Sequence, residues 1–260
     1  MSETTPVRPP RHRGIYLLPN LFTTGAMFAG FFAIIAGIGG RYTEAAVAVF
    51  IAALLDGMDG RVARMTGTQS EFGVQYDSLS DLVSFGLAPS LVMYTWSLST
   101  LREFGPLWGK LGWAAAFIYA ACAALRLARF NTQVGVADKR YFQGLASPAA
   151  AAVCMSFVWS VEKFGLTGAD FCFVTPGLTI VVGLLMVSRF RYFSFKSLPM
   201  GDRQRVPFVW MVAAVLLLAL LILDTPRVLF VGFTVYLLSG PVWTIWGLAT
   251  HRRRARRSAT

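Results

Sequence analysis

Residues Leu54–Gly86 read LLDGMDGRVARMTGTQSEFGVQYDSLSDLVSFG, and this stretch decides how the rest of the chain is interpreted. It holds Asp56, Asp59, Asp77 and Asp81, although the 260-residue chain has only 13 acidic residues. Around it the chain is 55% hydrophobic and only 14% charged. So few charged side chains cannot cover a soluble domain of this size. The sequence therefore predicts an all-α integral membrane protein.

The apolar stretches predict eight transmembrane helices, each long enough to cross a bilayer at about 1.5 Å per residue. Glycines and prolines fall at or near the predicted ends. The first apolar run follows three arginines, as in a signal peptide, but it is too long for a signal sequence, so we expect a retained helix. The predicted helices span residues 15–39, 43–66, 72–99, 107–131, 146–163, 173–189, 207–224 and 228–249.

The distribution of Lys and Arg predicts the orientation in the membrane. If the N-terminus is cytoplasmic, 19 of the 24 basic residues fall on the cytoplasmic side. Because basic residues favour cytoplasmic loops, we expect both termini and the aspartate-rich turn there. The net charge of +11 then needs no nucleic acid, and the basic tail 251–260 is expected to contact anionic lipid. The five basic residues left on the other side are Arg41, Arg102, Lys110, Lys163 and Arg227.

The spacing of the aspartates places them on two helical faces. Asp56 and Asp59 are three residues apart and share a face with Gly60 and Ala63. Asp77 and Asp81 follow on the next predicted helix.

The second of these faces also carries a glycine. Asp77 and Asp81 are four residues apart, and Gly73 lies one turn before Asp77. A short turn around Gly67 would bring the two faces together, so that four carboxylates converge at the cytoplasmic edge of the membrane.

Four converging carboxylates predict a site for divalent cations. Like charges so close together cannot all stay ionised without a cation. Oxygen ligands favour Mg²⁺, Mn²⁺ or Ca²⁺, and two such ions commonly assist displacement at phosphorus. Gly60 and Gly73 leave room for a bulky ligand, and Arg64 can bind phosphate. The alternative is that the aspartates are loop carboxylates paired with Arg61 and Arg64.

Other nucleophiles and metal ligands are scarce. The three cysteines, Cys122, Cys154 and Cys172, are widely spaced in apolar runs, so we expect buried thiols without a disulfide or metal cluster. The two histidines, His12 and His251, lie in the terminal tails. Direct displacement is therefore expected rather than a covalent intermediate.

The pattern D-G-x₂-A-R-x₈-G-x₃-D-x₃-D, from Asp59 to Asp81, resembles the motif of the CDP-alcohol phosphotransferases. The resemblance implies a six-helix catalytic core over 15–196, two further helices over 197–250, and cytoplasmic tails over 1–14 and 251–260. It also implies a divalent metal, Mn²⁺ or Mg²⁺, with two ions bound, and a homodimer.

The same resemblance implies a role for each residue of the motif. Asp81 would act as general base on the acceptor hydroxyl. The implied metal ligands are Asp56, Asp59, Asp77 and Asp81. The implied cytidine-diphosphate site consists of Asp56, Gly60, Ala63, Arg64 and Gly73.

Further stretches resemble the integral-membrane phosphatidylserine synthase branch of this family. They include LPNLFTTGAMFAGF at 18–31, DSLSDLVSFGLAP at 77–89 and SRFRYFSFK at 188–196. The implied reaction is transfer of the phosphatidyl group from CDP-diacylglycerol to L-serine, giving phosphatidylserine and CMP. The sequence shows no targeting signal and no expected disulfide, so we expect a bacterial inner membrane protein. Ala146 departs from the proline expected before Ser147, which affects packing more than chemistry. The alternatives are a glycerol phosphate, inositol phosphate or choline acceptor, or an ion-coupled transporter.

A serine acceptor carries a carboxylate, which calls for a guanidinium. Arg126 and Arg129 share a face near the cytoplasmic end of a predicted helix and are followed by Asn131. They are candidates for binding serine or a phosphate, or else they anchor the helix at the headgroups.

Three polar residues on other helices are further candidates for phosphate or serine binding. Asn20 and Thr23 stand at the start of the first helix and are candidates for contacting a headgroup. The alternative for Asn20 is that it caps this helix. Ser84 is a candidate substrate contact, or it bonds to a backbone carbonyl as serines in membrane helices do.

Overall fold

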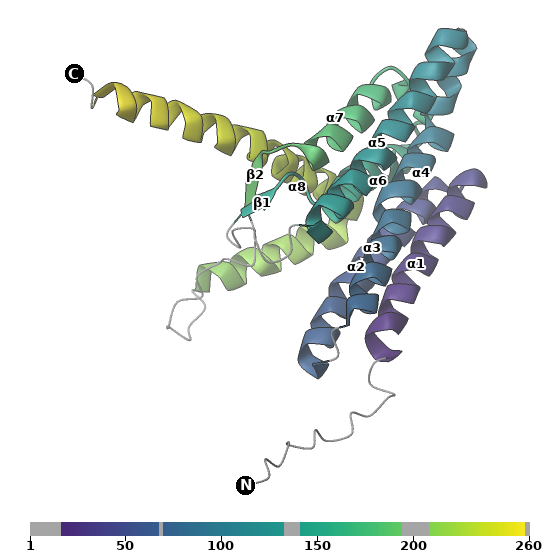
Figure 1. Ribbon diagram of the computed structural model, residues 1–260. Coiled ribbons are helices and arrows are strands. Elements are labelled where there is room, and N and C mark those ends of the chain that lie inside the picture. Colours follow the sequence, from purple (N-terminus) through teal and green to yellow (C-terminus); the bar gives the residue numbers. More distant parts are fainter. Residues whose placement is uncertain (1–16, 68–69, 133–140, 194–207, 258–260) are drawn as a thin grey trace.

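The computed structural model describes residues 17–67, 70–132, 141–193 and 208–257, and nearly all of them are helical (Figure 1). The helices are α1 (Leu17–Ile38), α2 (Tyr42–Thr66), α3 (Glu71–Asp81), α4 (Ala88–Trp96), α5 (Pro106–Thr132), α6 (Ser147–Lys163), α7 (Thr175–Val187) and α8 (Phe208–Arg257). Short 3₁₀ turns cover Leu98–Phe104 and Gly168–Phe171. The predicted helices are therefore confirmed as helical segments.

The predicted helix over 72–99 is not uniform. A π-helical segment, Leu82–Leu87, joins α3 to α4 without a break in the chain of helical residues. The sequence pattern does not distinguish this segment from an ordinary helix, because its hydrophobic residues suit either geometry.

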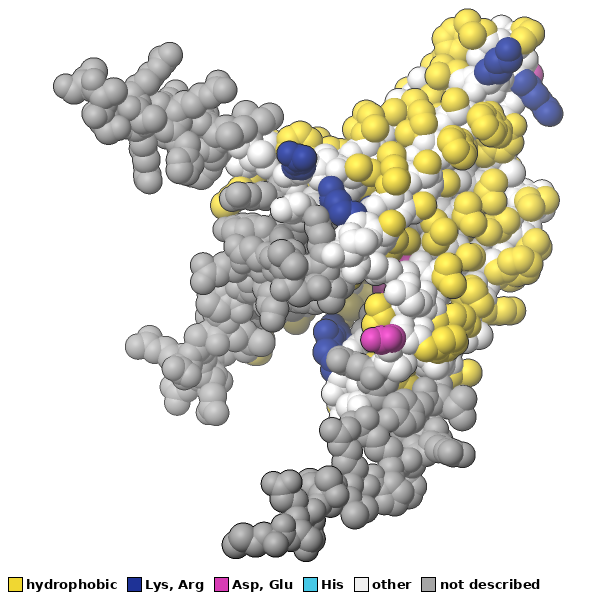
Figure 2. Space-filling model, viewed as in Figure 1, with side chains coloured by type: hydrophobic (Ala, Val, Ile, Leu, Met, Phe, Trp, Pro, Cys, Tyr) yellow, Lys and Arg dark blue, Asp and Glu magenta, His cyan; other side chains and the backbone are white. Residues whose placement is uncertain are grey.

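Four of the described helices are long and apolar enough to cross a membrane, and they indicate a membrane protein. They cover Leu18–Ile38, Glu71–Phe104, Pro106–Thr132 and Val215–Thr244. Thr175–Val187 is apolar but shorter. Figure 2 shows one face of the molecule, where hydrophobic side chains cover most of the long helices and charged side chains appear in a few places only.

Small residues let the helices approach closely. α1 packs along α2, α5 packs along α7, and α6 packs against both α2 and α8. Ala33 and Ala36 of α1 and Ala45 and Ala52 of α2 are fully buried. Helices in lipid associate through close packing of small side chains, because lipid offers no hydrophobic driving force between them.

The turn between α2 and α3 is built as expected. Gly67 ends α2 with φ of 63°, a left-handed conformation that glycine adopts without a steric cost, and its N–H donates to the Ala63 carbonyl. Ser70 then caps α3, since its hydroxyl accepts the Gly73 N–H at 3.0 Å. These two caps bring the aspartate-bearing faces of α2 and α3 together.

Two short strands were not expected from the sequence. β1 (Tyr141–Gln143) and β2 (Arg191–Phe193) pair antiparallel, just before α6 and just after α7. Each has only three residues, too few for a periodic pattern to show. The pairing satisfies backbone groups of two segments that leave the helical bundle.

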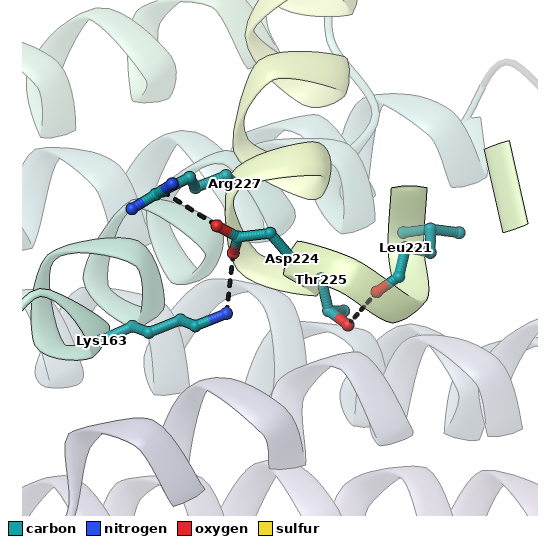
Figure 3. Close-up of polar contacts among 5 residues, drawn as sticks. All are labelled: Lys163, Leu221, Asp224, Thr225 and Arg227. Carbon is teal, nitrogen blue, oxygen red and sulfur yellow. Dashed lines mark hydrogen bonds and ion pairs between the residues drawn. The ribbon is translucent and has the colours of Figure 1, made fainter. Parts of the chain in front are cut away.

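α8 consists of two helices joined at a kink, and this agrees with the two C-terminal helices predicted over 207–224 and 228–249. Asp224 is non-helical (φ −150°, ψ 74°) and Pro226 follows it. Figure 3 shows the Asp224 carboxylate between two cations: Lys163 Nζ lies 2.9 Å from one oxygen and Arg227 Nε 3.0 Å from the other. Thr225 donates to the Leu221 carbonyl at 2.6 Å. Lys163 ends α6, so this cluster joins the kink to the core.

Candidate active site

The centre of the candidate site is a group of carboxylates from two helices. Asp56 and Asp59 come from α2 and Asp77 from α3. Each offers one oxygen, and these three oxygens lie within 4.8 Å of one another. Asp59 is buried, and Asp56 and Asp77 are half-buried. The residues of the two faces predicted from spacing therefore do converge.

Asp56 occupies the middle of this cluster. Its carboxyl group acts electrostatically on those of Asp59, Asp77 and Asp81. Arg126 of α5 acts electrostatically on Asp56 and Asp81. Asp81 is thus influenced both by the other carboxylates and by a guanidinium.

α1 connects the two aspartate-bearing helices. The Thr23 hydroxyl donates to Asp59 Oδ2 at 2.7 Å, and the Thr23 carbonyl accepts the Ser80 hydroxyl at 3.0 Å. Thr23 and Ser80 are both buried. One residue of α1 therefore touches α2 through its side chain and α3 through its backbone.

The cluster fits a divalent cation. Asp77 Oδ1 is buried and has no hydrogen-bond partner among the described residues. Carboxylate oxygens left without donors in a buried site suit a hard cation such as Mg²⁺ or Mn²⁺. Within the described part of the chain, no ion pair joins Arg61 or Arg64 to these aspartates. That finding is against the alternative of simple carboxylate–arginine pairs.

The residues expected around cytidine diphosphate lie beside this cluster on α2 and α3. Gly60 is exposed, and a side chain there would meet nothing within 4 Å, so the face is open. Ala63 is half-buried and Arg64 is exposed in the last turn of α2. Gly73 faces Asn20 of α1, whose Oδ1 would lie 3.7 Å from an added Cβ.

The two candidate arginines of α5 have different surroundings. Arg126 Nη1 donates to the Ser147 hydroxyl at 2.7 Å, at the start of α6. Arg129 donates to two backbone carbonyls, Val187 at 3.0 Å and Gln143 at 2.9 Å. Arg129 therefore ties the end of α7 to β1, whereas Arg126 bonds to α6 and acts electrostatically on Asp56 and Asp81.

The remaining candidates bond mainly to neighbouring helices. Asn131 and Ser78 exchange hydrogen bonds between α5 and α3, at 3.0 and 3.3 Å. The Ser84 hydroxyl is fully buried and donates to the Ala26 carbonyl of α1 at 3.0 Å. Both contacts fix the helix that carries Asp77 and Asp81.

Comparison with known proteins identifies the family. Residues 16–186 match the family model described as CDP-alcohol phosphatidyltransferase. The chain belongs to the CDP-alcohol phosphatidyltransferase family. The matched residues include every aspartate of the cluster and both arginines of α5, and they end within α7. α8 lies outside the region by which this CDP-alcohol phosphatidyltransferase is recognised.

Relatives of this CDP-alcohol phosphatidyltransferase occur in bacteria and archaea. It is 37% identical over 183 residues to a CDP-diacylglycerol–serine O-phosphatidyltransferase of Helicobacter pylori strain J99, covering 70% of this chain and 74% of that protein. A protein of the same name in Mycobacterium tuberculosis strain H37Rv is 37% identical over 166 residues, or 61% of this chain and 55% of the other. An archaetidylserine synthase of Methanothermobacter thermautotrophicus is 33% identical over 177 residues, or 67% and 69%.

The sequence analysis missed two residues that support the site. Ser147 holds Arg126, and Tyr119 of α5 donates to the Phe85 carbonyl at 3.1 Å. Ser147 could have been noticed, because Ser followed by Pro at a predicted helix start leaves its hydroxyl free to meet another helix. Tyr119 carries no such signal in an apolar run.

Proposed function

We propose that this protein transfers the phosphatidyl group of CDP-diacylglycerol to the hydroxyl of L-serine, giving phosphatidylserine and CMP. The observation that carries the proposal is the convergence of Asp56, Asp59 and Asp77 in a chain similar to enzymes named for this reaction. The relative from Methanothermobacter thermautotrophicus is named an archaetidylserine synthase, and this name also indicates a product that contains serine.

The aspartate cluster is the proposed metal site. Asp56, Asp59 and Asp77 would hold two Mn²⁺ or Mg²⁺ ions, with Asp81 adjoining them. When bound, these ions neutralise the pyrophosphate of the donor and stabilise the charge of the departing CMP. Gly60, whose surroundings are open, lets the nucleotide approach the backbone of α2.

The other proposed nucleotide contacts lie beside the aspartates on α2 and α3. Ala63 and Gly73 complete the small-residue surface beside the aspartates, and the exposed Arg64 supplies a charge-assisted contact to phosphate. Asn20 and Thr23 border this surface from α1, where Thr23 orients Asp59 through its hydroxyl.

Asp81 is the proposed general base. The serine oxygen forms a bond to the phosphorus that carries diacylglycerol, and the bond from that phosphorus to the CMP oxygen breaks. The proton of the serine hydroxyl passes to the Asp81 carboxylate. Cys122, Cys154 and Cys172 are all buried in the core, so none of them is placed to form a covalent intermediate.

Arg126 is the proposed contact for the serine carboxylate. It lies near Asp81, so a serine bound to its guanidinium would present its hydroxyl to the base. Its hydrogen bond to Ser147 uses Nη1 and leaves the other nitrogens for a ligand. Arg129 bonds to two carbonyls instead, and its proposed part is to hold the neighbouring backbone in place.

The proposal includes the arrangement in the membrane. Eight spans, with the two halves of α8 counted separately, place both termini and the aspartate cluster on the cytoplasmic side of a bacterial inner membrane. The catalytic core comprises 15–196, and α8 adds two spans. The protein is proposed to be a homodimer, which light scattering of the detergent-solubilised protein tests.

A panel of acceptors tests the reaction. Purified protein with Mn²⁺ and CDP-diacylglycerol is given L-serine, glycerol 3-phosphate, inositol phosphate or choline, and CMP release and the lipid product are measured. We expect phosphatidylserine and CMP in equal amounts with L-serine only. CMP release with another acceptor and none with L-serine would overturn the proposed substrate.

A further inference from the structure

The helix that carries Asp77 and Asp81 changes its geometry immediately after Asp81. Leu82–Leu87 form a π-helical segment, in which the Ala88 N–H bonds to the carbonyl five residues before it, that of Val83. An α-helix uses the carbonyl four residues before. Such a segment accommodates one additional residue, and π-helical turns inside α-helices are frequent at functional sites.

The additional residue sets the direction in which the aspartates point. An α-helix rotates by about 100° per residue, so one more residue turns α3 relative to α4 by about that angle. α4 is fixed by its buried side chains Val92, Met93 and Trp96. With α4 fixed, the π-helical segment decides whether Asp77 and Asp81 face the carboxylates of α2.

Pro89 leaves a backbone carbonyl of this segment without its helical donor, and Tyr119 supplies another. Pro89 has no N–H to offer the carbonyl four residues before it, which is that of Phe85. The Tyr119 hydroxyl of α5 donates to this same carbonyl at 3.1 Å. Tyr119 and Phe85 are both fully buried, where an unpaired phenol or carbonyl would be costly.

α1 holds the segment from the opposite side. The Ser84 hydroxyl donates to the Ala26 carbonyl at 3.0 Å. Gly30 lies so close to Ser84 that an added Cβ would collide with its backbone at 2.6 Å. The π-helical segment is therefore held by hydrogen bonds to both α1 and α5.

We infer that Tyr119 is a positioning residue, which acts through the Phe85 carbonyl and the π-helical segment to keep Asp77 and Asp81 in register with Asp56. Tyr119 touches neither metal nor substrate in this assignment. The inference rests on the proposed role of the aspartates as metal ligands, and it concerns the binding of metal rather than the identity of the acceptor.

Mn²⁺ binding by the full-length protein tests the inference. Chelator-treated Tyr119→Phe protein is titrated with Mn²⁺ by electron paramagnetic resonance. We expect affinity to fall about five- to tenfold, the factor that corresponds to loss of one neutral hydrogen bond. The turnover number kcat should fall as well, because it depends on the same carboxylates.

Tyr42→Phe is the matched control. The Tyr42 hydroxyl also donates to the carbonyl of a neighbouring helix, that of Thr95 at 2.9 Å, but away from the aspartates. Both variants should lower the Tm of the metal-free protein, and only Tyr119→Phe should weaken Mn²⁺ binding. Pro89→Ala gives a second test, because it offers an N–H to the Phe85 carbonyl and should also weaken Mn²⁺ binding.

The outcomes separate the positioning role of Tyr119 from the proposed reaction with serine. Mn²⁺ affinity and kcat that stay normal in Tyr119→Phe would overturn the inference and leave Tyr119 as a packing residue. A wild-type protein that binds no Mn²⁺ would overturn both the metal site and the inference. A wild-type protein that binds Mn²⁺ but uses another acceptor would overturn the proposed reaction alone.

Discussion

At the scale of single residues, four carboxylates differ in their surroundings and therefore in what they can do. Asp59 is held by the Thr23 hydroxyl and Asp77 has a buried oxygen without a donor. Asp81 interacts electrostatically with the Asp56 carboxylate and with the Arg126 guanidinium. A carboxylate with a free oxygen suits a metal, whereas one beside a guanidinium suits the proton transfer from an acceptor bound there.

Asp81→Asn and Asp77→Asn should therefore have different effects. Asp81→Asn removes the proposed base but keeps the shape of the side chain, so kcat should fall by about 10²–10⁴-fold while CDP-diacylglycerol still binds. Asp77→Asn should lose Mn²⁺ binding, since it replaces a charged ligand by a neutral one. Turnover numbers and Mn²⁺ titrations of both variants check this. Near-normal turnover in Asp81→Asn would show that the base is another group.

The two arginines of α5 make a second comparison. Arg126→Lys loses the planar fork that binds a carboxylate, so KM for serine should rise while KM for CDP-diacylglycerol changes little. Arg129→Lys loses at least one of two carbonyl bonds, so it should lower Tm with a smaller change in KM for serine. The assignment fails if KM for serine changes only in Arg129→Lys.

At the scale of elements, helix positions follow from apolar length, and the relative rotation of helices does not. The sequence pattern predicts where α1, α2 and α5 lie because each has a long apolar run bounded by glycine or proline. It does not predict the π-helical segment after Asp81, since the hydrogen bond that accompanies it comes from Tyr119, 34 positions beyond Phe85 in the chain. Long-range contacts of this kind leave no local periodicity.

The candidate site was predictable to a similar extent. The motif spacing indicates that Asp56 and Asp77 share one site. The i to i+3 and i to i+4 repeats put the aspartates on one face of each helix, and a short turn around Gly67 joins the two helices. The spacing does not separate Arg126 from Arg129, which share a face but bond to different partners: Arg126 to the Ser147 hydroxyl and Arg129 to two backbone carbonyls. β1 and the end of α7, which meet Arg129, are brought together by tertiary structure alone.

The kink in α8 is an element whose attachment can be tested. Asp224 forms ion pairs with Lys163 of α6 and with Arg227 of α8 (Figure 3). Asp224→Asn should therefore weaken the attachment of α8 to the core. These side chains are partly exposed, so we expect a fall in Tm of about 1–4 °C with unchanged KM values. Glu44→Gln is the control, because its pair with Arg41 is local to the start of α2. An equal fall in both variants would show that the junction does not depend on Asp224.

At the scale of the whole molecule, the site and the membrane constrain each other. In the proposed reaction, two substrates of opposite character meet at the aspartates: a lipid that stays in the bilayer and a water-soluble amino acid. Asp59 lies about two helical turns before the end of α2, and Asp77 lies about two turns after the start of α3. A site near the edge of the membrane can be reached from the bilayer and from water. Serine reaches it only if the turn at Gly67 faces the compartment that holds serine.

Labelling of single cysteines tests that orientation. Glu71 and Glu103 are both exposed glutamates, one at the start of α3 and the other in the 3₁₀ turn before α5. They lie at opposite ends of the candidate span Glu71–Phe104. In a protein whose three buried cysteines are replaced by alanine, Glu71→Cys should react with a membrane-impermeant maleimide only after permeabilisation. Glu103→Cys should react in intact spheroplasts, because the excess of basic residues on the opposite side of the membrane predicts that Glu103 faces away from the cytoplasm. The reverse pattern would place the aspartate cluster on the outer side and contradict the arrangement proposed for the enzyme.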